Sequence, residues 1–312
     1  MPTIGKGLTM KKLFHGLLDS VSRRLGVDAI SQIAIDQELR RIRAEIRAVM
    51  PQNPAVRGFK VYSQIDEDGI IEAIFDDIGT KTKFFVEVGA GNGLENNSHY
   101  LLHKGWRGVW VEGDPAQVEE IKAGCKRAAA DAGDLDLCVY NGYVTSSNID
   151  SILGTCLAPF GLRPEARPEI DLLSMDIDGN DLPVLSAISV VRPRVICAEY
   201  NPKFPPPLSL EGTLDDGESW SGDDFYGASL QAFTDRLEKR GYTLVCCNAS
   251  GNNAFFVESS ALARSPLVVY EPRKLYQEAR YHLVRKRSGH RASLAYLARR
   301  NVRFLSEAAT SR

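Results

Sequence analysis

Residues 84–93 read FFVEVGAGNG, a short β-rich run that is followed at once by three closely spaced glycines. Glycines at such a turn let the backbone pass close beneath a ligand, and the N-terminus of the following helix offers free N–H groups. Many α/β proteins carry glycines there for packing alone, so the motif by itself is a weak sign of ligand binding. The stretch therefore indicates an α/β fold first, and a ligand only in combination with other residues.

Strand-like and helix-like segments alternate on both sides of this stretch. We expect strands at residues 84–88, 108–112, 135–140, 170–177 and 194–200, with helices between them near residues 98–104, 117–130, 149–157 and 182–188. This alternation predicts βαβ units and a parallel sheet. Two further strands, at residues 241–247 and 254–258, are joined by too short a bridge for a parallel crossover and must be antiparallel. The expected fold is α/β and Rossmann-like, mostly parallel with a terminal antiparallel hairpin.

Helical extensions are expected at both ends of this domain. Residues 1–57 form the predicted N-terminal extension, in which Leu39, Ile42, Ile46 and Val49 share one helix face at three- and four-residue spacing. Residues 58–260 form the predicted α/β domain. Residues 261–312 form a predicted basic, mainly helical C-terminal extension, because the chain carries 11 Lys and Arg against 3 Glu from residue 271 onward.

The composition excludes several classes of protein. With 44% hydrophobic and 25% charged residues the chain is not largely disordered, and no stretch approaches the roughly 18 apolar residues of a membrane span. The basic tail lacks interleaved aromatics or a nucleic-acid motif, so we expect no nucleic-acid partner. None of the six cysteines forms a Cys-x-x-Cys pair, and several lie in apolar runs, which favours reduced thiols and a cytoplasmic location.

Glu112 ends the strand that follows the glycine turn, 23 residues after Gly89. A carboxylate at that place can accept both hydroxyls of a ribose, although a solvated Glu before a turn would look the same. The glycine spacing is Gly-x-Gly-x-Gly rather than the Gly-x-Gly-x-x-Gly of dinucleotide-binding proteins. Glu87, inside the strand, would repel a pyrophosphate but suits the ammonium of an amino-acid tail. These features favour S-adenosylmethionine (SAM) over NAD.

Five separated motifs carry a resemblance to a known family. They are SQIDED at residues 63–68, VEVGAGNG at 86–93, EGDP at 112–115, SMDIDGND at 174–181 and YGASL at 226–230. In this order they resemble the FkbM-like class I SAM-dependent methyltransferases over residues 58–260. The resemblance implies a seven-stranded sheet with SAM over the carboxyl ends of the first strands. It also implies O-methylation of a sugar hydroxyl in a glycan or glycoside precursor, as in polysaccharide biosynthesis.

Cofactor contacts follow from the same resemblance, position by position. It implies that Glu87 and the glycine turn hold the methionine part, Glu112 the ribose, and residues 142–145 the adenine, while Gln64 closes over the cofactor from the N-terminal side. The implied contacts are Gln64, Glu87, Gly89, Gly91, Gly93, Glu112, Tyr143, Val144 and Asp176. A capping box or a plain surface loop would explain Gln64 and Tyr143 equally well.

Acidic residues end two neighbouring strands of the expected sheet. Asp176 and Asp178 are two residues apart, so they share one face, and Glu199 and Asn201 end the next strand. Carboxylates at neighbouring strand ends repel one another unless a cation lies between them, and Mg²⁺ is the cation that we expect for a set of oxygen ligands. Two interpretations stay open: a metal held by these four residues, or metal-free catalysis in which Asp178 and Glu199 act as bases.

The long, proline-punctuated segment at residues 202–227 is the last feature of note. Its aromatic residues, Phe204, Trp220, Phe225 and Tyr226, could stack on a sugar face if the segment covers the carboxyl edge of the sheet. A packed loop with aromatic anchors is the alternative. The expected partners are a sugar or glycan acceptor and, through the terminal helices, a second copy of the chain. A SAM-fold scaffold without catalysis and an NAD-dependent oxidoreductase are the competing function classes.

Overall fold

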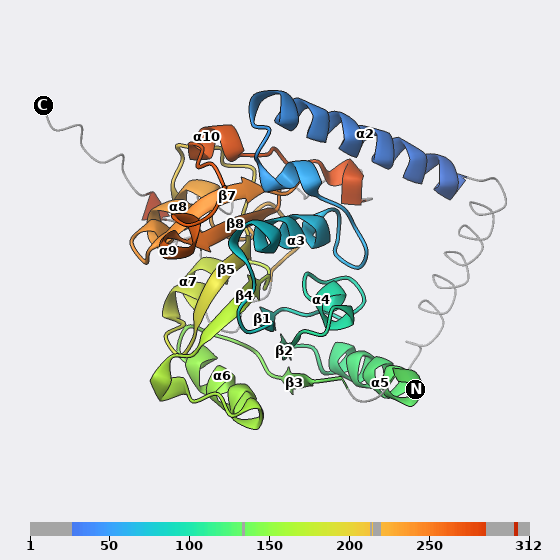
Figure 1. Cartoon of the computed structure of the whole chain (residues 1–312), viewed down its shortest axis with the longest axis vertical. Helices are drawn as coiled ribbons and strands as arrows, with labels where there is room; N and C mark the ends of the chain where they lie inside the picture. Colours follow the sequence, from blue (N-terminus) through green and yellow to red (C-terminus); the bar gives the residue numbers. More distant parts are fainter. Residues whose placement is uncertain (1–26, 133–134, 213, 215–219, 285–302, 305–312) are drawn as a thin grey trace, which may run out of the picture.

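The computed structural model describes residues 27–132, 135–212, 214, 220–284 and 303–304. Its centre is a seven-stranded sheet in the order β3-β2-β1-β4-β5-β8-β7 (Figure 1). The strands are β1 (Phe84–Val88), β2 (Arg107–Glu112), β3 (Leu137–Asn141), β4 (Glu169–Met175), β5 (Arg192–Glu199), β7 (Tyr242–Cys247) and β8 (Asn253–Glu258). A second, two-stranded sheet pairs β6 (Leu210–Glu211) with β9 (Arg303–Phe304) in antiparallel fashion.

The pairing of the strands confirms the predicted fold class. β1 runs parallel to both β2 and β4, and β3 and β5 extend the parallel sheet on either side. β8 lies between β5 and β7 and is antiparallel to both. All five residues of β1 are buried, as expected for a central strand of a parallel sheet covered on both faces.

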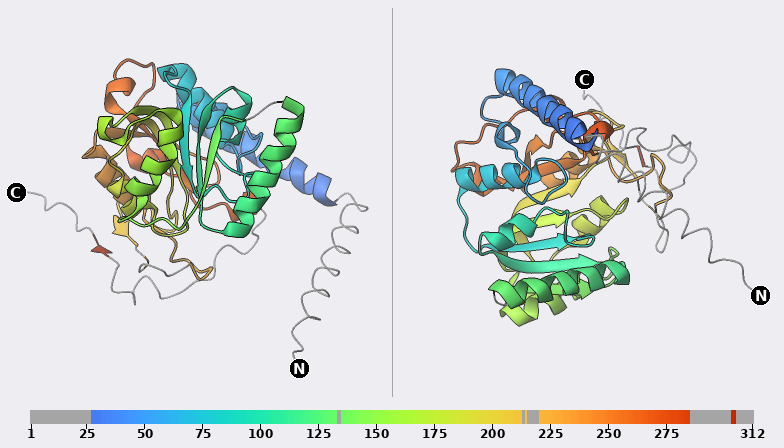
Figure 2. Two further views of the ribbon diagram at one scale, coloured as in Figure 1. Left: turned by 90° about the horizontal axis from the view of Figure 1, so that it is seen from below. Right: turned by 90° about the vertical axis from the view of Figure 1, so that its right-hand side faces the viewer.

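Helices cover both faces of the sheet. They are α2 (Val27–Val49), α3 (Glu67–Ile78), α4 (His99–His103), α5 (Pro115–Ala132), α6 (Ile149–Leu157), α7 (Asp181–Ala187), α8 (Leu230–Glu238), α9 (Ser259–Leu262) and α10 (Pro272–Leu275). The described residues also contain the 3₁₀ turns η1 (Pro54–Arg57), η2 (Ala158–Phe160), η3 (Pro164–Ala166) and η4 (Tyr281–Val284). Figure 2 shows α5 on one side of the strands and α6 and α7 on the other.

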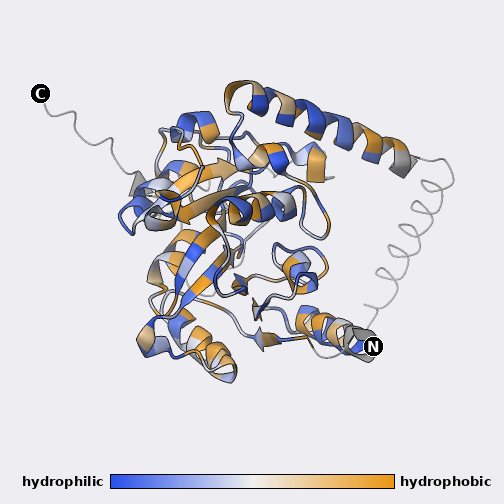
Figure 3. Cartoon of the chain, viewed as in Figure 1, coloured by the Kyte–Doolittle hydropathy of each residue, from blue (hydrophilic) through white to orange (hydrophobic). Residues whose placement is uncertain are grey.

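The predicted N-terminal helix is present as α2, which lies along one end of the molecule (Figure 1). Leu39, Ile42 and Ile46 are buried against the domain, as the apolar spacing predicted. Val49 is 73% exposed, so its place on that face was wrong: the helix ends there and the chain turns away into η1. Figure 3 shows polar and apolar residues mixed along α2. Within the described parts of the chain, no helix is both long and apolar enough to cross a membrane.

The C-terminal extension differs from the prediction where it is described. Residues 261–284 contain the end of α9, the one-turn helix α10 and η4, while the stretches 263–271 and 276–280 are neither helix nor strand. A mainly helical extension is therefore wrong for this part. The segment is instead fixed by single contacts to the domain, such as the Tyr200 hydroxyl, which donates to the Gln277 carbonyl oxygen at 2.8 Å. Most of the basic tail lies outside the described residues.

Candidate functional site

A cavity of about 740 Å³ lies at the carboxyl ends of β1, β2 and β4. In an open α/β sheet this is where ligands bind, and the volume is in the range of small-molecule sites. Seven of the predicted site residues line it, namely Gly89, Gly91, Glu112, Tyr143, Val144, Asp176 and Asp178. Residues at the ends of four different strands, β1 to β4, therefore meet around one space.

The glycine turn after β1 is shaped by two close approaches. Gly89 has φ +86°, and a Cβ there would lie 1.6 Å from the Asp176 carbonyl oxygen, so only glycine allows β1 and β4 to end side by side. A Cβ on Gly93 would lie 2.9 Å from the Trp110 ring, and Gly93 is not among the residues that line the cavity. Gly93 thus packs against Trp110, and its contact with the cofactor stays a prediction.

Glu112 joins the end of β2 to the glycine turn. Its Oε2 accepts a hydrogen bond from the Gly91 N–H at 2.8 Å, and its Oε1 accepts one from the Asp114 N–H at 2.8 Å. A carboxylate offers about four acceptor positions, so two remain for a ligand. The side chain is 9% exposed and lines the cavity, which is the placement expected of a residue that accepts ribose hydroxyls.

Tyr143 and Val144 form the wall beyond β3. The Asn148 amide donates to the Tyr143 carbonyl oxygen at 2.9 Å, and its oxygen accepts from the Thr145 N–H at 2.8 Å, so the turn is held at both ends. The Tyr143 ring is 65% exposed and packs beside Gly113. An exposed ring on the cavity wall offers a stacking face for a planar base. The adenine contact stays a prediction that this geometry suits.

Two predicted cofactor residues lie elsewhere. Glu87 is 3% exposed and does not line the cavity, because its oxygens accept hydrogen bonds from the Asn97 and Ser98 N–H groups at 2.8 and 3.1 Å. Gln64 lines a second, smaller pocket instead, and its Oε1 accepts from Asn252 at 2.9 Å. Neither residue lines the large cavity, and the implied contacts of Glu87 with the methionine part and of Gln64 with the cofactor stay predictions.

Burial raises the pKa of Glu87 from 4.5 to about 7. The folded state thus binds this proton more tightly than the unfolded state, and the free energy of unfolding falls as pH rises through the interval between the two values. We expect Glu87→Gln to lack this dependence. The free energy of unfolding of the variant, relative to that of wild type, should therefore rise by about 2 to 3 kcal/mol between about pH 5 and about pH 8. Urea unfolding at both pH values measures it. The same difference between variant and wild type at both pH values would contradict the raised pKa of Glu87. A SAM affinity changed by more than about threefold would contradict its position away from the cofactor.

Three carboxylates meet at the ends of β4 and β5. Ligand oxygens of Asp176, Asp178 and Glu199 lie within 4.8 Å of one another. Burial, and then repulsion from the neighbouring carboxylates, raises the pKa of Asp176 and of Glu199 well above the usual range. Within the described part of the chain, Oε2 of Glu199 is buried without a hydrogen-bond partner. The set of hard oxygen donors fits a divalent cation, and it fits general-base catalysis equally well.

Asp181 shapes this cluster, although the sequence analysis assigned it no role. Its carboxylate accepts from the Ile177 N–H at 2.8 Å and the Gly179 N–H at 3.0 Å, which closes the turn that carries Asp178. Asp178 has φ +54°, a conformation that few residues other than glycine adopt. The turn therefore holds the Asp178 carboxylate over the cavity at a cost in backbone strain.

Asn201, the fourth predicted metal ligand, is turned toward the segment that follows it. Its amide donates to the Asp224 carbonyl oxygen at 3.0 Å, and its oxygen accepts from the Lys203 N–H at 3.1 Å. The residue is fully buried and lines neither pocket. In this structure Asn201 anchors the start of the 202–227 segment, and its role as a metal ligand stays a prediction.

That segment does cover the carboxyl edge. The Asn180 side chain accepts a hydrogen bond from the Leu214 N–H at 2.8 Å and donates one to the Leu214 carbonyl oxygen at 3.1 Å. Leu214 and Trp220 line the cavity. Phe225 is buried in a small cluster with Leu214, so stacking on a ligand is open to Trp220 but not to Phe225. Sequence analysis missed Asn180 and Leu214; the only signal for Asn180 was its place in the 174–181 motif.

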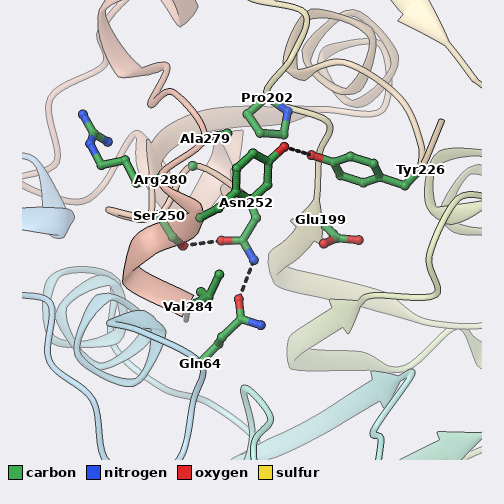
Figure 4. Close-up of a pocket in the computed structure, with 11 residues that line it drawn as sticks. Gln64, Glu199, Pro202, Tyr226, Ser250, Asn252, Ala279, Arg280 and Val284 are labelled. Atoms are coloured by element: carbon green, nitrogen blue, oxygen red, sulfur yellow. Dashed lines mark hydrogen bonds between the residues drawn. The ribbon is translucent and has the colours of Figure 1, made fainter. Parts of the chain in front are cut away.

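Glu199 lines a second pocket, of about 50 Å³, and not the large cavity (Figure 4). Gln64, Tyr226 and Asn252 line it too, together with residues 279–281 of the C-terminal extension. The acidic cluster thus contributes to both, since Asp176 and Asp178 line the large cavity and Glu199 the small one.

No family model matches the chain, and no curated protein matches it either. Solved structures with a similar arrangement include an O-methyltransferase from Bacillus cereus in complex with S-adenosylhomocysteine (SAH; 16% identity over 73% of this chain and 95% of that chain, TM-score 0.40). Another is magnesium protoporphyrin IX methyltransferase from Synechocystis PCC 6803 with bound SAH (13% identity, 62% and 82%, TM-score 0.40).

An arsenic(III) SAM methyltransferase from Chlamydomonas reinhardtii is also similar, at 19% identity over 39% of this chain and with a TM-score of 0.28. This chain spans 40% of the length of that protein. At such low identities the function has to be argued from the cavity and its side chains.

Proposed function

We propose that the chain is a SAM-dependent methyltransferase that methylates a sugar hydroxyl in a glycan or glycoside precursor. The observation that carries the proposal is the position of Glu112, which ends β2, holds the glycine turn and faces the 740 Å³ cavity across from the acidic cluster. The sequence motifs that resemble FkbM-like enzymes support the sugar acceptor. In this proposal residues 58–260 form the catalytic domain, and residues 1–57 and 261–312 are extensions.

The cavity suits SAM at four points. Glu112 keeps acceptor positions for the ribose, Tyr143 offers a ring face to the adenine, and the backbone of Gly89 and Gly91 leaves room for the methionine part. Asp176, on the far wall, suits the ammonium group. When bound, SAM supplies a methyl group whose transfer to an acceptor oxygen releases SAH and one proton.

The residues of this chain then have two tasks, which are to align the acceptor oxygen and to take up its proton. Asp178 and Glu199 are the candidates to accept the proton, because each offers a carboxylate oxygen in the acidic cluster. Mg²⁺ bound to Asp176, Asp178 and Glu199 would supply a Lewis acid that lowers the pKa of the hydroxyl. Turnover in the presence of a chelator, with and without Mg²⁺ added back, distinguishes the two routes.

Binding of SAM is the first test. Isothermal titration of the full chain is expected to give a micromolar dissociation constant for SAM and no binding of NAD, because Glu112 with the tight glycine turn suits a nucleoside without a pyrophosphate. Absence of SAM binding, with or without Mg²⁺, would overturn the proposal and leave the non-catalytic scaffold. Binding of NAD would favour the oxidoreductase.

Location and assembly complete the proposal. We infer a cytoplasmic enzyme, since the six cysteines are free in the structure and four of them are buried. Nucleic acid is not an expected partner. A homo-oligomer would use the terminal helices, and the exposed Ile30, Ile33 and Val49 on α2 are among the apolar side chains available to such a contact.

A further inference from the structure

The small pocket beside Glu199 brings together parts of the chain that are far apart in sequence. Gln64 precedes α3, Ser250–Asn252 form the turn between β7 and β8, and Ala279–Val284 belong to the C-terminal extension (Figure 4). A volume of about 50 Å³ holds roughly three to five water-sized groups. That space fits the edge of a small polar ring rather than a whole cofactor.

The polar groups on its wall are held in fixed orientations. The Asn252 amide donates to Gln64 Oε1 at 2.9 Å, and the Ser250 hydroxyl donates to Asn252 Oδ1. Because Gln64 Oε1 is used in this way, its N–H groups are the part that can serve a ligand. Glu199 contributes an acceptor whose Oε2 is buried and has no hydrogen-bond partner within the described residues. A donor and an acceptor together match a hydroxyl group, which can both accept and donate.

The aromatic side of the pocket comes from Tyr226 and Tyr281, whose hydroxyl groups lie 3.2 Å apart. Tyr281 belongs to the C-terminal extension, outside residues 58–260. The extension is fixed at this point, since the Arg280 N–H donates to the Ser250 carbonyl oxygen at 2.9 Å and the Tyr276 hydroxyl donates to the Pro202 carbonyl oxygen at 2.5 Å. The pocket therefore exists only because the extension packs onto the domain.

Charge distinguishes between neutral and anionic ligands. The Arg280 guanidinium donates to the Ala249 carbonyl oxygen at 2.9 Å and to Gln277 Oε1 at 3.0 Å. Figure 4 shows its side chain directed away from Glu199. The Arg280 guanidinium is thus already held by acceptors of the protein and does not pair with a ligand in the pocket, while Glu199 adds an acidic group to its wall, a combination that disfavours a phosphate or uronate.

We propose that this pocket binds the hydroxyl-bearing edge of a neutral sugar, and that Tyr281 determines which sugar edge fits. The proposal rests on the proposed function, because it gives the methyl acceptor a place at the acidic cluster but outside the cofactor cavity. Glu199 then contacts the acceptor, while Asp176 and Asp178 face the cofactor cavity.

The test uses the full chain and a panel of methyl glycosides of neutral hexoses, deoxyhexoses and pentoses, with methyl glucuronide as the anionic member. Saturation-transfer NMR in the presence of SAH measures their binding. We expect at least one neutral glycoside to bind, Tyr281→Ala to weaken it at least about fivefold, and Tyr281→Phe to change the order of preference. The affinity for SAH stays within about twofold. Tyr270→Phe, in the same extension but on neither pocket, is the matched control.

Each contrary outcome overturns a definite part of the inference. If no neutral glycoside binds, or if methyl glucuronide binds better than methyl glucoside, the neutral-sugar pocket is wrong. If Tyr281→Ala and Tyr281→Phe both bind the panel as wild type does, Tyr281 does not select the acceptor; should the Ala variant not fold, the Phe variant decides. A failure to bind SAH would contradict the proposed function. Binding of the glycosides would still test the proposal about the small pocket on its own.

Discussion

Glu199→Gln is expected to lower methyl transfer to any accepted sugar by about 10²- to 10⁴-fold, while the affinity for SAM stays within about threefold. The amide has nearly the same shape as the carboxylate but can neither take up a proton nor neutralise a cation. Glu199 lines the small pocket and not the large cavity. Its loss should therefore appear in turnover rather than in cofactor binding. SAH release with the best glycoside of the panel, together with titration of SAM, measures both.

Glu169→Gln is the matched control for this variant. Glu169 begins β4, at the end of the sheet opposite to the acidic cluster, and it forms ion pairs with Lys81 and Arg192 at 2.8 and 3.1 Å. Such pairs at the surface contribute little, so its turnover should match wild type. Full activity of Glu199→Gln would show that Glu199 neither accepts the proton nor holds a metal, and would leave Asp178 as the base.

The fold could be predicted from the sequence because its signals are local. The run at residues 84–88 is apolar except for Glu87, as a strand buried on both faces requires, and the bridge between the last two strands is too short to be anything but an antiparallel connection. The same locality explains why Glu112 and the Asp176 and Asp178 pair were found, since each of them ends a strand at the same edge of the sheet.

What the sequence could not predict depends on contacts between distant segments. Glu87 was assigned to a ligand on the family resemblance and because its charge suits an ammonium group. Its hydrogen-bond donors, Asn97 and Ser98, lie in a loop with no recognisable spacing to it. The small pocket joins Gln64 to Asn252 and to the C-terminal extension, and no periodicity links them. The extension itself has the composition of a helix, but its path is set by close backbone contact: a Cβ on Gly251 would lie 2.2 Å from the Glu278 carbonyl oxygen.

Glu112→Ala is expected to weaken SAM binding at least about 100-fold. Two hydrogen bonds from ribose hydroxyls to a charged acceptor are worth about 3 kcal/mol at the low end, and each 1.4 kcal/mol is a factor of ten. The variant also removes the acceptor of the Gly91 and Asp114 N–H groups, so the glycine turn loses the contact that holds it against β2. Both effects act on the same wall of the cavity and in the same direction.

Glu112→Gln separates the two contributions. The amide keeps one oxygen, but its NH₂ group must face either the Gly91 or the Asp114 N–H, so one of these donors loses its acceptor. We expect an intermediate loss of about tenfold in SAM affinity, with the melting temperature close to that of wild type. Glu119→Ala, an ion-paired and 73% exposed side chain on α5, controls for the loss of a surface carboxylate. If Glu112→Ala folds and still binds SAM within about threefold of wild type, Glu112 serves the turn alone, and the ribose has to be held by other groups of the cavity wall.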